Sequence, residues 1–265
     1  MTYTALVLAA QRKGEINPLA AAEGETYKCV IDMVGRPMIS RVVECLADSP
    51  EIGQILICID EPEVVEQIAP LDRLAAEGRL AYVPSGPNLF ESVKIALSGD
   101  IAFPVLITTA DNALMTPDMI RDYCASYEAS GAEVGVAVTR AETIWAKYPD
   151  GQRRPHRFAD GPYSNCNIFT LQSAEALRAA KAFEGGGQFG KSKKRVLQAF
   201  GVFNLLLYVS KRLTIAQVFK RISKRFGLNV AAIELDYAEA PIDVDNERTA
   251  RIARQALTER ENAAA

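Results

Sequence analysis

Short runs of apolar residues recur along the chain at regular intervals. They lie at residues 4–9, 54–60, 80–83, 105–107, 133–138, 163–169 and 229–235. These runs are rich in β-branched residues and mostly lack polar alternation, which is typical of strands buried on both faces of a parallel sheet. The sequence therefore predicts a sheet built from these strands.

Helices are expected between these runs. They are predicted from residue 37 to about 47, from 63, from 88 to about 97, from 117, from 214 and after 246. Helices that alternate with strands at this spacing indicate βαβ units and a mostly parallel central sheet. We therefore expect a three-layer α/β/α fold. The length of 265 residues, 49% of them hydrophobic, suits a single large domain spanning residues 1–265.

One stretch departs from the alternation and is predicted to be a basic helical insertion at about residues 185–227. A glycine-rich break at 185–190 is followed by Lys and Arg at 191–195, an apolar run at 196–209 and an amphipathic helix with further Lys and Arg. Cationic residues beside an apolar helix are typical of a segment that lies on an anionic membrane surface. The alternative is a helical subdomain packed on the sheet, with its lysines in solvent.

Charge and cysteine content exclude several classes of protein. The net charge of −3 gives no overall basic field, which argues against nucleic acid as a partner. The five cysteines are scattered without a C-x-x-C pair, and there is one histidine, so a zinc or disulfide scaffold is not expected. The chain starts directly with a strand, and no run is long enough to span a membrane, so we expect a cytoplasmic protein that can associate peripherally with the inner membrane face.

Candidate chemistry begins where the strand at 105–107 ends. Asp111 follows that strand, and ligands of open α/β sheets bind at the carboxyl ends of the strands. Thr116 and Pro117 then supply the N-cap and first residue of a helix. We expect a metal ion and phosphates to bind at the short loop between Asp111 and this helix. The alternative is that Asp111 only caps a turn.

Other polar segments are predicted to reach the same sheet edge. Arg12 and Lys13 lie in the glycine-containing loop after the first strand, which suits a triphosphate, although such residues are also common in solvated loops. Lys28 precedes a predicted short strand and a Gly-x-Pro turn at 35–37. The loop at 84–88 leads to Ser92 and places a glycine turn over this edge.

Two pairs of residues are spaced by two on extended chain, so each pair faces one way. Asn165 and Asn167 form one pair and are candidates for binding a hydroxyl or phosphate of an acceptor. Asp243 and Asp245 form the other. His156 has no carboxylate or serine nearby in sequence to orient it, and we interpret it as a surface residue without a catalytic role.

Together these residues resemble a known family, the nucleotidyltransferases with a glycosyltransferase-A-like fold. The branch in question holds molybdenum-cofactor guanylyl- and cytidylyltransferases and sugar- or alditol-phosphate cytidylyltransferases. The resemblance covers residues 6 to about 248, without the basic stretch. Its motifs are LVLAA at 6–10, Lys28, GRPMI at 35–39, PSG at 84–86 with Ser92-Val93, Ala110-Asp111, residues 165–167 and IDVD at 242–245.

The resemblance implies roles for individual residues. Lys28, Arg12 and Asp111 take the catalytic positions. The implied nucleotide-binding set is Ala9, Ala10, Arg12, Lys13, Lys28, Pro84, Ser85, Gly86 and Ser92. Asp111 and Asp245 would hold Mg²⁺, and Asn165 and Asn167 would bind the acceptor. One motif departs from the family: its loop usually reads Ala-Gly-Gly-x-Gly-x-Arg, whereas residues 9–14 read AAQRKG. With fewer glycines, the backbone of this loop cannot approach a phosphate as closely. Either triphosphate binding depends more on Arg12 and Lys13, or catalysis is lost.

The expected function is a Mg²⁺-dependent nucleotidyltransferase that joins a nucleoside triphosphate to a phosphorylated small-molecule or lipid-linked acceptor and releases pyrophosphate. CTP or UTP is favoured because residues 84–88 resemble the cytidylyltransferase loop and contain no acidic residue to read guanine. Two alternatives remain. One is a glycosyltransferase of the same fold that uses an NDP-sugar, and the other is a catalytically silent nucleotide-binding or membrane-adaptor protein.

Overall fold

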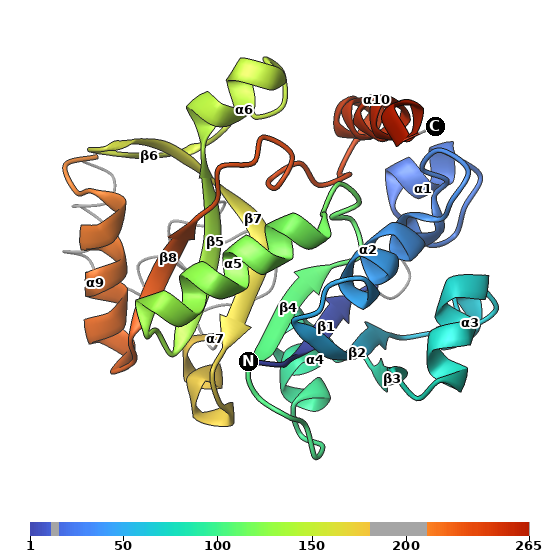
Figure 1. Ribbon diagram of the computed structural model, residues 1–265, viewed down its shortest axis with the longest axis horizontal. Coiled ribbons are helices and arrows are strands. Elements are labelled where there is room, and N and C mark those ends of the chain that lie inside the picture. Colours follow the sequence, from blue (N-terminus) through green and yellow to red (C-terminus); the bar gives the residue numbers. More distant parts are fainter. Residues whose placement is uncertain (12–15, 181–210, 265) are drawn as a thin grey trace.

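A central sheet organises the molecule (Figure 1). The computed structural model describes residues 1–11, 16–180 and 211–264. Within them the strand order is β3-β2-β1-β4-β7-β5-β8, and β6 pairs with β7 outside this path. The strands are β1 (Tyr3–Leu8), β2 (Ile52–Ile59), β3 (Leu80–Pro84), β4 (Val105–Thr109), β5 (Val134–Arg140), β6 (His156–Phe158), β7 (Gly161–Leu171) and β8 (Val230–Glu234).

Most of the strands run parallel. β1 is parallel to β2 and β4, β2 to β3, and β5 to β8, whereas β7 is antiparallel to both β4 and β5. The prediction of a mostly parallel sheet is confirmed. The single reversed strand separates a four-stranded parallel half from β5 and β8.

Helices cover both faces of the sheet, as the three-layer prediction requires. The described helices are α1 (Pro18–Ala22), α2 (Met38–Ala47), α3 (Ala69–Ala76), α4 (Leu89–Ala96), α5 (Pro117–Ser130), α6 (Ala141–Lys147), α7 (Leu177–Ala180), α9 (Ile215–Phe226) and α10 (Glu247–Ala264). Alternate residues of β1 face opposite layers. Ala5 and Val7 pack in a core cluster with α2, α3 and α5, while Leu6 packs in another with α4 and α9. Apolar contacts on both faces explain why the strands read as continuous apolar runs.

A third apolar cluster covers the carboxyl edge of the parallel strands. Ala253 and Leu257 of α10 pack there with Leu19 of α1 and Ile144 of α6, together with Val244 of the segment before α10. Figure 1 shows α10 lying across this end of the molecule. The C-terminal helix therefore fixes the segment that precedes it against the sheet edge.

Two local predictions are wrong. The short strand expected after Lys28 is a 3-10 turn, Lys28–Val30, followed by one isolated bridge between Asp32 and Pro37. Positive φ angles at Val34 and Gly35 fold this segment into a narrow loop, so it does not continue as a strand. The helix expected from residue 63 is likewise only a 3-10 turn, and α3 starts at Ala69, where Pro70 suits the first turn of a helix.

The predicted basic insertion lies largely outside the described residues, including its cluster at 191–195. Its last helix, α9, is described and begins with a capping box between Thr214 and Gln217. Ile215 is buried, and Phe219, Ile222 and Phe226 pack against the core clusters. Among the described helices, none is long and apolar enough to cross a membrane.

Candidate functional site

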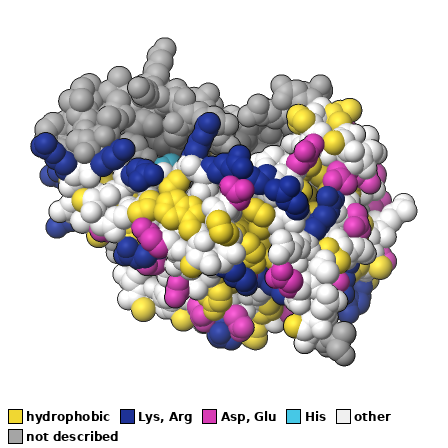
Figure 2. Space-filling model, turned by 90° about the horizontal axis from the view of Figure 1, so that it is seen from above, with side chains coloured by type: hydrophobic (Ala, Val, Ile, Leu, Met, Phe, Trp, Pro, Cys, Tyr) yellow, Lys and Arg dark blue, Asp and Glu magenta, His cyan; other side chains and the backbone are white. Residues whose placement is uncertain are grey.

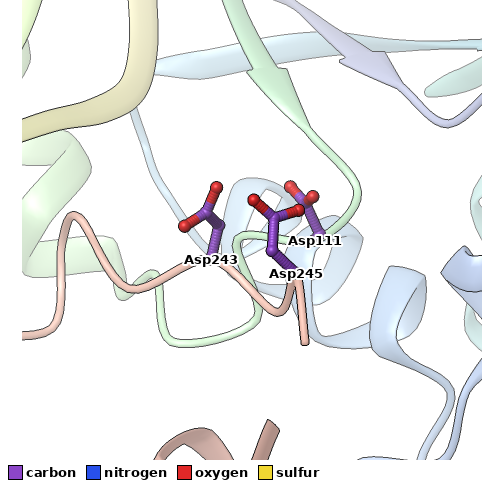
Figure 3. Close-up of side chains that lie close together, drawn as sticks. All are labelled: Asp111, Asp243 and Asp245. Atoms are coloured by element: carbon purple, nitrogen blue, oxygen red, sulfur yellow. The ribbon is translucent and has the colours of Figure 1, made fainter. Parts of the chain in front are cut away.

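Three aspartates converge at the carboxyl edge of the sheet (Figure 3). Asp111 lies in the loop after β4, and Asp243 and Asp245 lie in the segment before α10. Each offers one carboxylate oxygen, and these oxygens lie within 4.8 Å of one another. Three carboxylates at this separation repel one another unless positive charge lies between them. The site is therefore suited to a cation.

Backbone contacts hold the two segments together. The amide of Val244 donates to the carbonyl of Asp111 at 3.0 Å, so the late segment is fixed directly to the loop after β4. Asn246 caps α10, because its Oδ1 accepts from the amides of Arg248 and Thr249 at 3.1 and 3.2 Å. The Thr249 hydroxyl also accepts from the amide of Asp245 at 3.0 Å. The start of α10 thus sets the position of Asp245.

Lys28 supplies positive charge at this cluster. Its Nζ lies 2.5 Å from Asp111 Oδ2 and 2.7 Å from Asp245 Oδ1. Burial alone would lower the pKa of Lys28, but the charges of Asp111 and Asp245 raise it above its ordinary value. The ammonium is therefore charged and occupies the position of a cation between two carboxylates.

Asp243 is held on the other side of the cluster by asparagine. Asn167 Nδ2 donates to Asp243 Oδ2 at 3.1 Å, and Asn165 Nδ2 donates to Asn167 Oδ1 at 2.8 Å. Asn167 has a φ of 52°, where the pairing of β7 with β5 is irregular. This bulge turns Asn167 toward Asp243. Burial, and then the charges of Asp111 and Asp245, raise the pKa of Asp243 to about 7.

The loop after β3 is closed by Ser92. Its Oγ is buried and accepts from the amide of Gly86 at 2.9 Å. A Cβ at Gly86 would lie 2.8 Å from the backbone of Glu91 and Ser92. The structure thus uses the Ser92 hydroxyl to hold the loop, while Pro84 is exposed and Ser85 is half-buried at the sheet edge.

The first loop is described only in part. Ala9 is buried and its amide donates to the carbonyl of Cys58 at 2.9 Å, and Ala10 is exposed at the end of β1. Arg12 and Lys13 lie outside the described residues. Of the predicted site residues, the structure thus brings Lys28, Asp111 and Asp245 into direct contact.

Two contributors to the cluster had no assigned role in the sequence-based prediction. Asp243 is the third carboxylate of the cluster; the sequence predicts only that it faces the same way as Asp245. Thr109, at the end of β4, donates to Asp111 Oδ1 at 2.5 Å and fixes that carboxylate. A threonine ending a buried strand gives no sequence signal for such a role.

The donor set fits a hard divalent cation. Mg²⁺ binds carboxylate oxygens and usually retains several waters or phosphate oxygens as further ligands. Asp111 and Asp245 have side chains that are 19% and 44% exposed, so both can be reached from solvent. The contact of Lys28 with both carboxylates shows that this position accepts positive charge.

Comparisons with known proteins show the family and the fold. A family model described as the MobA-like NTP transferase domain matches residues 6–199. A hypothetical transferase from Thermus thermophilus superposes with a TM-score of 0.76 at 23% identity, covering 94% of this chain and 100% of its own. The search of curated proteins found no match.

Two further solved structures share the fold. The 4-diphosphocytidyl-2C-methyl-D-erythritol synthase of Anaerococcus prevotii has a TM-score of 0.56 at 10% identity, with 97% of this chain and 96% of that chain covered. A CMP:2-keto-3-deoxy-manno-octonic acid synthetase, solved in complex with CTP, has a TM-score of 0.59 at 12% identity, with 98% and 100% covered. At these identities the likeness shows the fold alone.

Proposed function

Because this chain belongs to the family of the MobA-like NTP transferase domain and is a nucleotidyltransferase, we propose that it joins a nucleoside triphosphate to a phosphorylated acceptor in a Mg²⁺-dependent reaction that releases pyrophosphate. The observation that supports this proposal best is the convergence of Asp111, Asp243 and Asp245 at the sheet edge. Asp111 and Asp245 would hold the metal. When bound, Mg²⁺ neutralises phosphate charge and polarises the phosphorus that is attacked.

The residues of the chain mainly position the two substrates and neutralise their negative charge. Lys28 carries a stable positive charge beside the carboxylates, where the triphosphate would arrive. The acceptor oxygen attacks the α-phosphorus and forms a new P–O bond. The bond from the α-phosphorus to the bridging oxygen breaks, and that oxygen leaves on pyrophosphate with the electron pair. Such a reaction depends on alignment and charge stabilisation more than on covalent chemistry by the protein.

The acceptor would lie on the side of the cluster formed by β7. Asn165 Oδ1 is buried and accepts no hydrogen bond from the part of the chain that the structure describes. An acceptor hydroxyl that donates to this oxygen would remove the cost of leaving it unpaired. Asn167 is committed to Asp243 and would act by holding that carboxylate.

The nucleotide is proposed to be CTP or UTP. The loop at 84–88 contains no carboxylate for guanine, and Ser92 holds Gly86 so that backbone groups of the loop are fixed. A structurally similar synthetase was solved with CTP, which agrees with a pyrimidine. In the presence of Mg²⁺, CTP or UTP should raise the melting temperature more than GTP or ATP, because a ligand of the native state stabilises it. A larger shift with GTP would overturn the pyrimidine assignment and leave the transfer reaction standing.

Pyrophosphate release tests the reaction itself. The protein is incubated with CTP, Mg²⁺ and a filtered small-molecule extract of cells as the source of acceptor. We expect pyrophosphate to form only when all are present and to disappear with EDTA. A glycosyltransferase of the same fold would form no pyrophosphate and would instead release a nucleoside diphosphate from an NDP-sugar. A silent nucleotide-binding or membrane-adaptor protein would turn over neither substrate.

A further inference from the structure

Two arginines from distant parts of the chain meet at one aspartate, Asp150. Arg248, in the first turn of α10, donates from Nη1 to the backbone carbonyl of Asp150. Arg153 donates from Nη2 to a carboxylate oxygen of the same Asp150 at 3.4 Å. The two guanidinium groups therefore meet at one residue, and only that of Arg153 pairs with its carboxylate, so one aspartate faces two positive charges.

One member of this arginine pair, Arg248, lies within electrostatic range of Asp243 in the cluster. Arg248 follows Asp245 by three residues on the chain. Burial lowers the pKa of Arg248, the charges of Arg153 and Arg251 lower it further, and the charges of Asp150 and Asp243 raise it. Arg248 also precedes Thr249, whose hydroxyl accepts from the amide of Asp245 at 3.0 Å, so an anion bound by Arg248 would lie near the carboxylates.

The turn that carries Arg153 is held in one conformation. The amide of Gly151 donates to the carbonyl of Tyr148 at 2.8 Å, and Trp145 Nε1 donates to the carbonyl of Gln152 at 2.8 Å. A Cβ at Gly151 would lie 2.8 Å from Ile144 Cγ2, so the turn packs closely on α6. Arg153 projects from a fixed backbone, which lowers the entropic cost of binding a ligand.

Figure 2 shows this side of the molecule. Lys and Arg side chains form a row across the face seen from above, which is the side of α6, β6 and α10 in Figure 1. The chain as a whole carries a net charge of −3, so this concentration of positive charge is local. A local cationic surface at a strand-end site favours an anionic ligand.

We propose that Arg153 and Arg248 bind the phosphate group of the acceptor, so that the acceptor is a phosphate monoester held beside Asp243. This inference rests on the proposed function and adds the residues that select the acceptor. The planar guanidinium group of arginine presents donors that match phosphate oxygens. Two such groups can bind a phosphate dianion and leave its third oxygen free to attack.

A phosphate monoester also suits the chemistry. Its second pKa is near 6, so at neutral pH it is mostly a dianion and its oxygen attacks without losing a proton. The attacking oxygen forms the new P–O–P linkage, and pyrophosphate leaves with the electron pair of the broken bond. The two arginines orient the attacking phosphate and offset its repulsion from the triphosphate.

The test uses inorganic phosphate as the probe. The full-length protein is first saturated with Mg²⁺ and a non-hydrolysable CTP analogue, so that the triphosphate position is filled. Phosphate is then titrated at constant ionic strength, and its affinity is read from the melting temperature and from ³¹P line widths. Variants are Arg153→Gln, Arg248→Gln and Arg248→Lys. Arg73→Gln, an exposed arginine on α3 at the other end of the sheet, is the matched control.

We expect Arg153→Gln and Arg248→Gln each to weaken phosphate binding about tenfold, a loss typical of one charge-assisted contact. Arg248→Lys should recover part of the loss, and Arg73→Gln should match the wild type. Affinity for the analogue with Mg²⁺ should be unchanged in all variants. If the wild type does not bind the CTP analogue with Mg²⁺, this result counts against the proposed function itself.

Two results would overturn the inference while leaving the proposed function intact. One is that the wild type and both Gln variants bind phosphate with the same affinity, or that none of them binds it. The other is tighter Mg²⁺ binding in Arg248→Gln at unchanged phosphate affinity, which would mean that the arginine only offsets the charge of the carboxylates. Arg153 lies on an exposed turn, so its variant keeps the test valid if Arg248→Gln folds poorly.

Discussion

Asp243 links the stability of the protein to pH. Its pKa of about 7 is above the ordinary value of 3.8, because burial and the charges of Asp111 and Asp245 disfavour its ionised form. Between these two values the folded protein keeps a proton that the unfolded chain releases. The free energy of unfolding contributed by this group therefore falls as pH rises from about 4 to about 7, and it changes little above that.

We expect the melting temperature in EDTA to fall across this pH interval for the wild type. Asp243→Asn should remove that part of the decline and melt higher than the wild type above pH 7, because the amide carries no buried charge. Glu77→Gln, at the exposed C-cap of α3, provides a control with the same change of charge. Parallel melting curves for the wild type and Asp243→Asn would contradict the assignment.

Asp111 should be the most sensitive position for catalysis. It accepts from Thr109 and Lys28, and its backbone accepts from Val244, so Asp111→Asn can keep its place while losing the charge that balances the metal. We expect pyrophosphate release to fall at least about a hundredfold, the size of other losses of electrostatic stabilisation. Asp245→Asn should be milder, since its side chain is more exposed.

The measurement is the rate of pyrophosphate release beside the melting temperature of each variant. Asp111→Asn should melt within a few degrees of the wild type. Wild-type turnover in Asp111→Asn would show that the metal assignment is wrong.

At the scale of elements, the loop between β3 and α4 depends on Gly86. Alanine there would place its Cβ 2.8 Å from the backbone of Glu91 and Ser92, so the first turn of α4 must move. We expect a loss of about 1–3 kcal/mol in the free energy of unfolding, as for other overpacked sites, and a smaller thermal shift with CTP or UTP.

Gly99→Ala is the matched control for this loop. The nearest atom to its Cβ would be Ile101 Cγ1, at 3.9 Å, which is an ordinary contact. If Gly86→Ala kept the full nucleotide shift, the loop would not contribute to nucleotide binding.

The sequence predicts elements better than it predicts contacts between them. Buried strands and the helix starts at Pro37 and Thr116 follow from local composition, and the structure confirms them. Lys28 contacts Asp111, which is 83 residues away in the sequence, and Asp245, which is 217 residues away. No local sequence pattern contains such contacts. The turn after Lys28 could not be predicted either, because the positive φ of Val34 is imposed by the fold on a residue that disfavours it. The 3-10 geometry there places Lys28 at the site.

On the scale of the whole molecule, the basic surface of α9 bears on the proposed membrane association. The apolar side chains of α9 pack on the core, so attachment through this helix would be electrostatic, through Lys220, Lys224 and Arg225, which are exposed. We expect the protein to float with anionic vesicles at low salt and to be released as salt screens these charges. Neutralising the three residues should reduce flotation, whereas equal partitioning into neutral and anionic vesicles would favour a packed helix with solvated lysines.

The reversed strand β7 has a consequence for how such an enzyme can diversify. It pairs with β4, the strand that precedes Asp111, carries Asn165 itself, and separates the parallel strands β1 to β4 from β5 and β8. In the proposed function, the loops that would bind the nucleotide lie before residue 112, whereas Asn165 and the arginine pair, which would bind the acceptor, lie after it. On that proposal, mutations in the second stretch would change the acceptor while the proposed nucleotide loops and their core stay intact. Among relatives, we therefore expect acceptor preference to change faster in evolution than nucleotide preference.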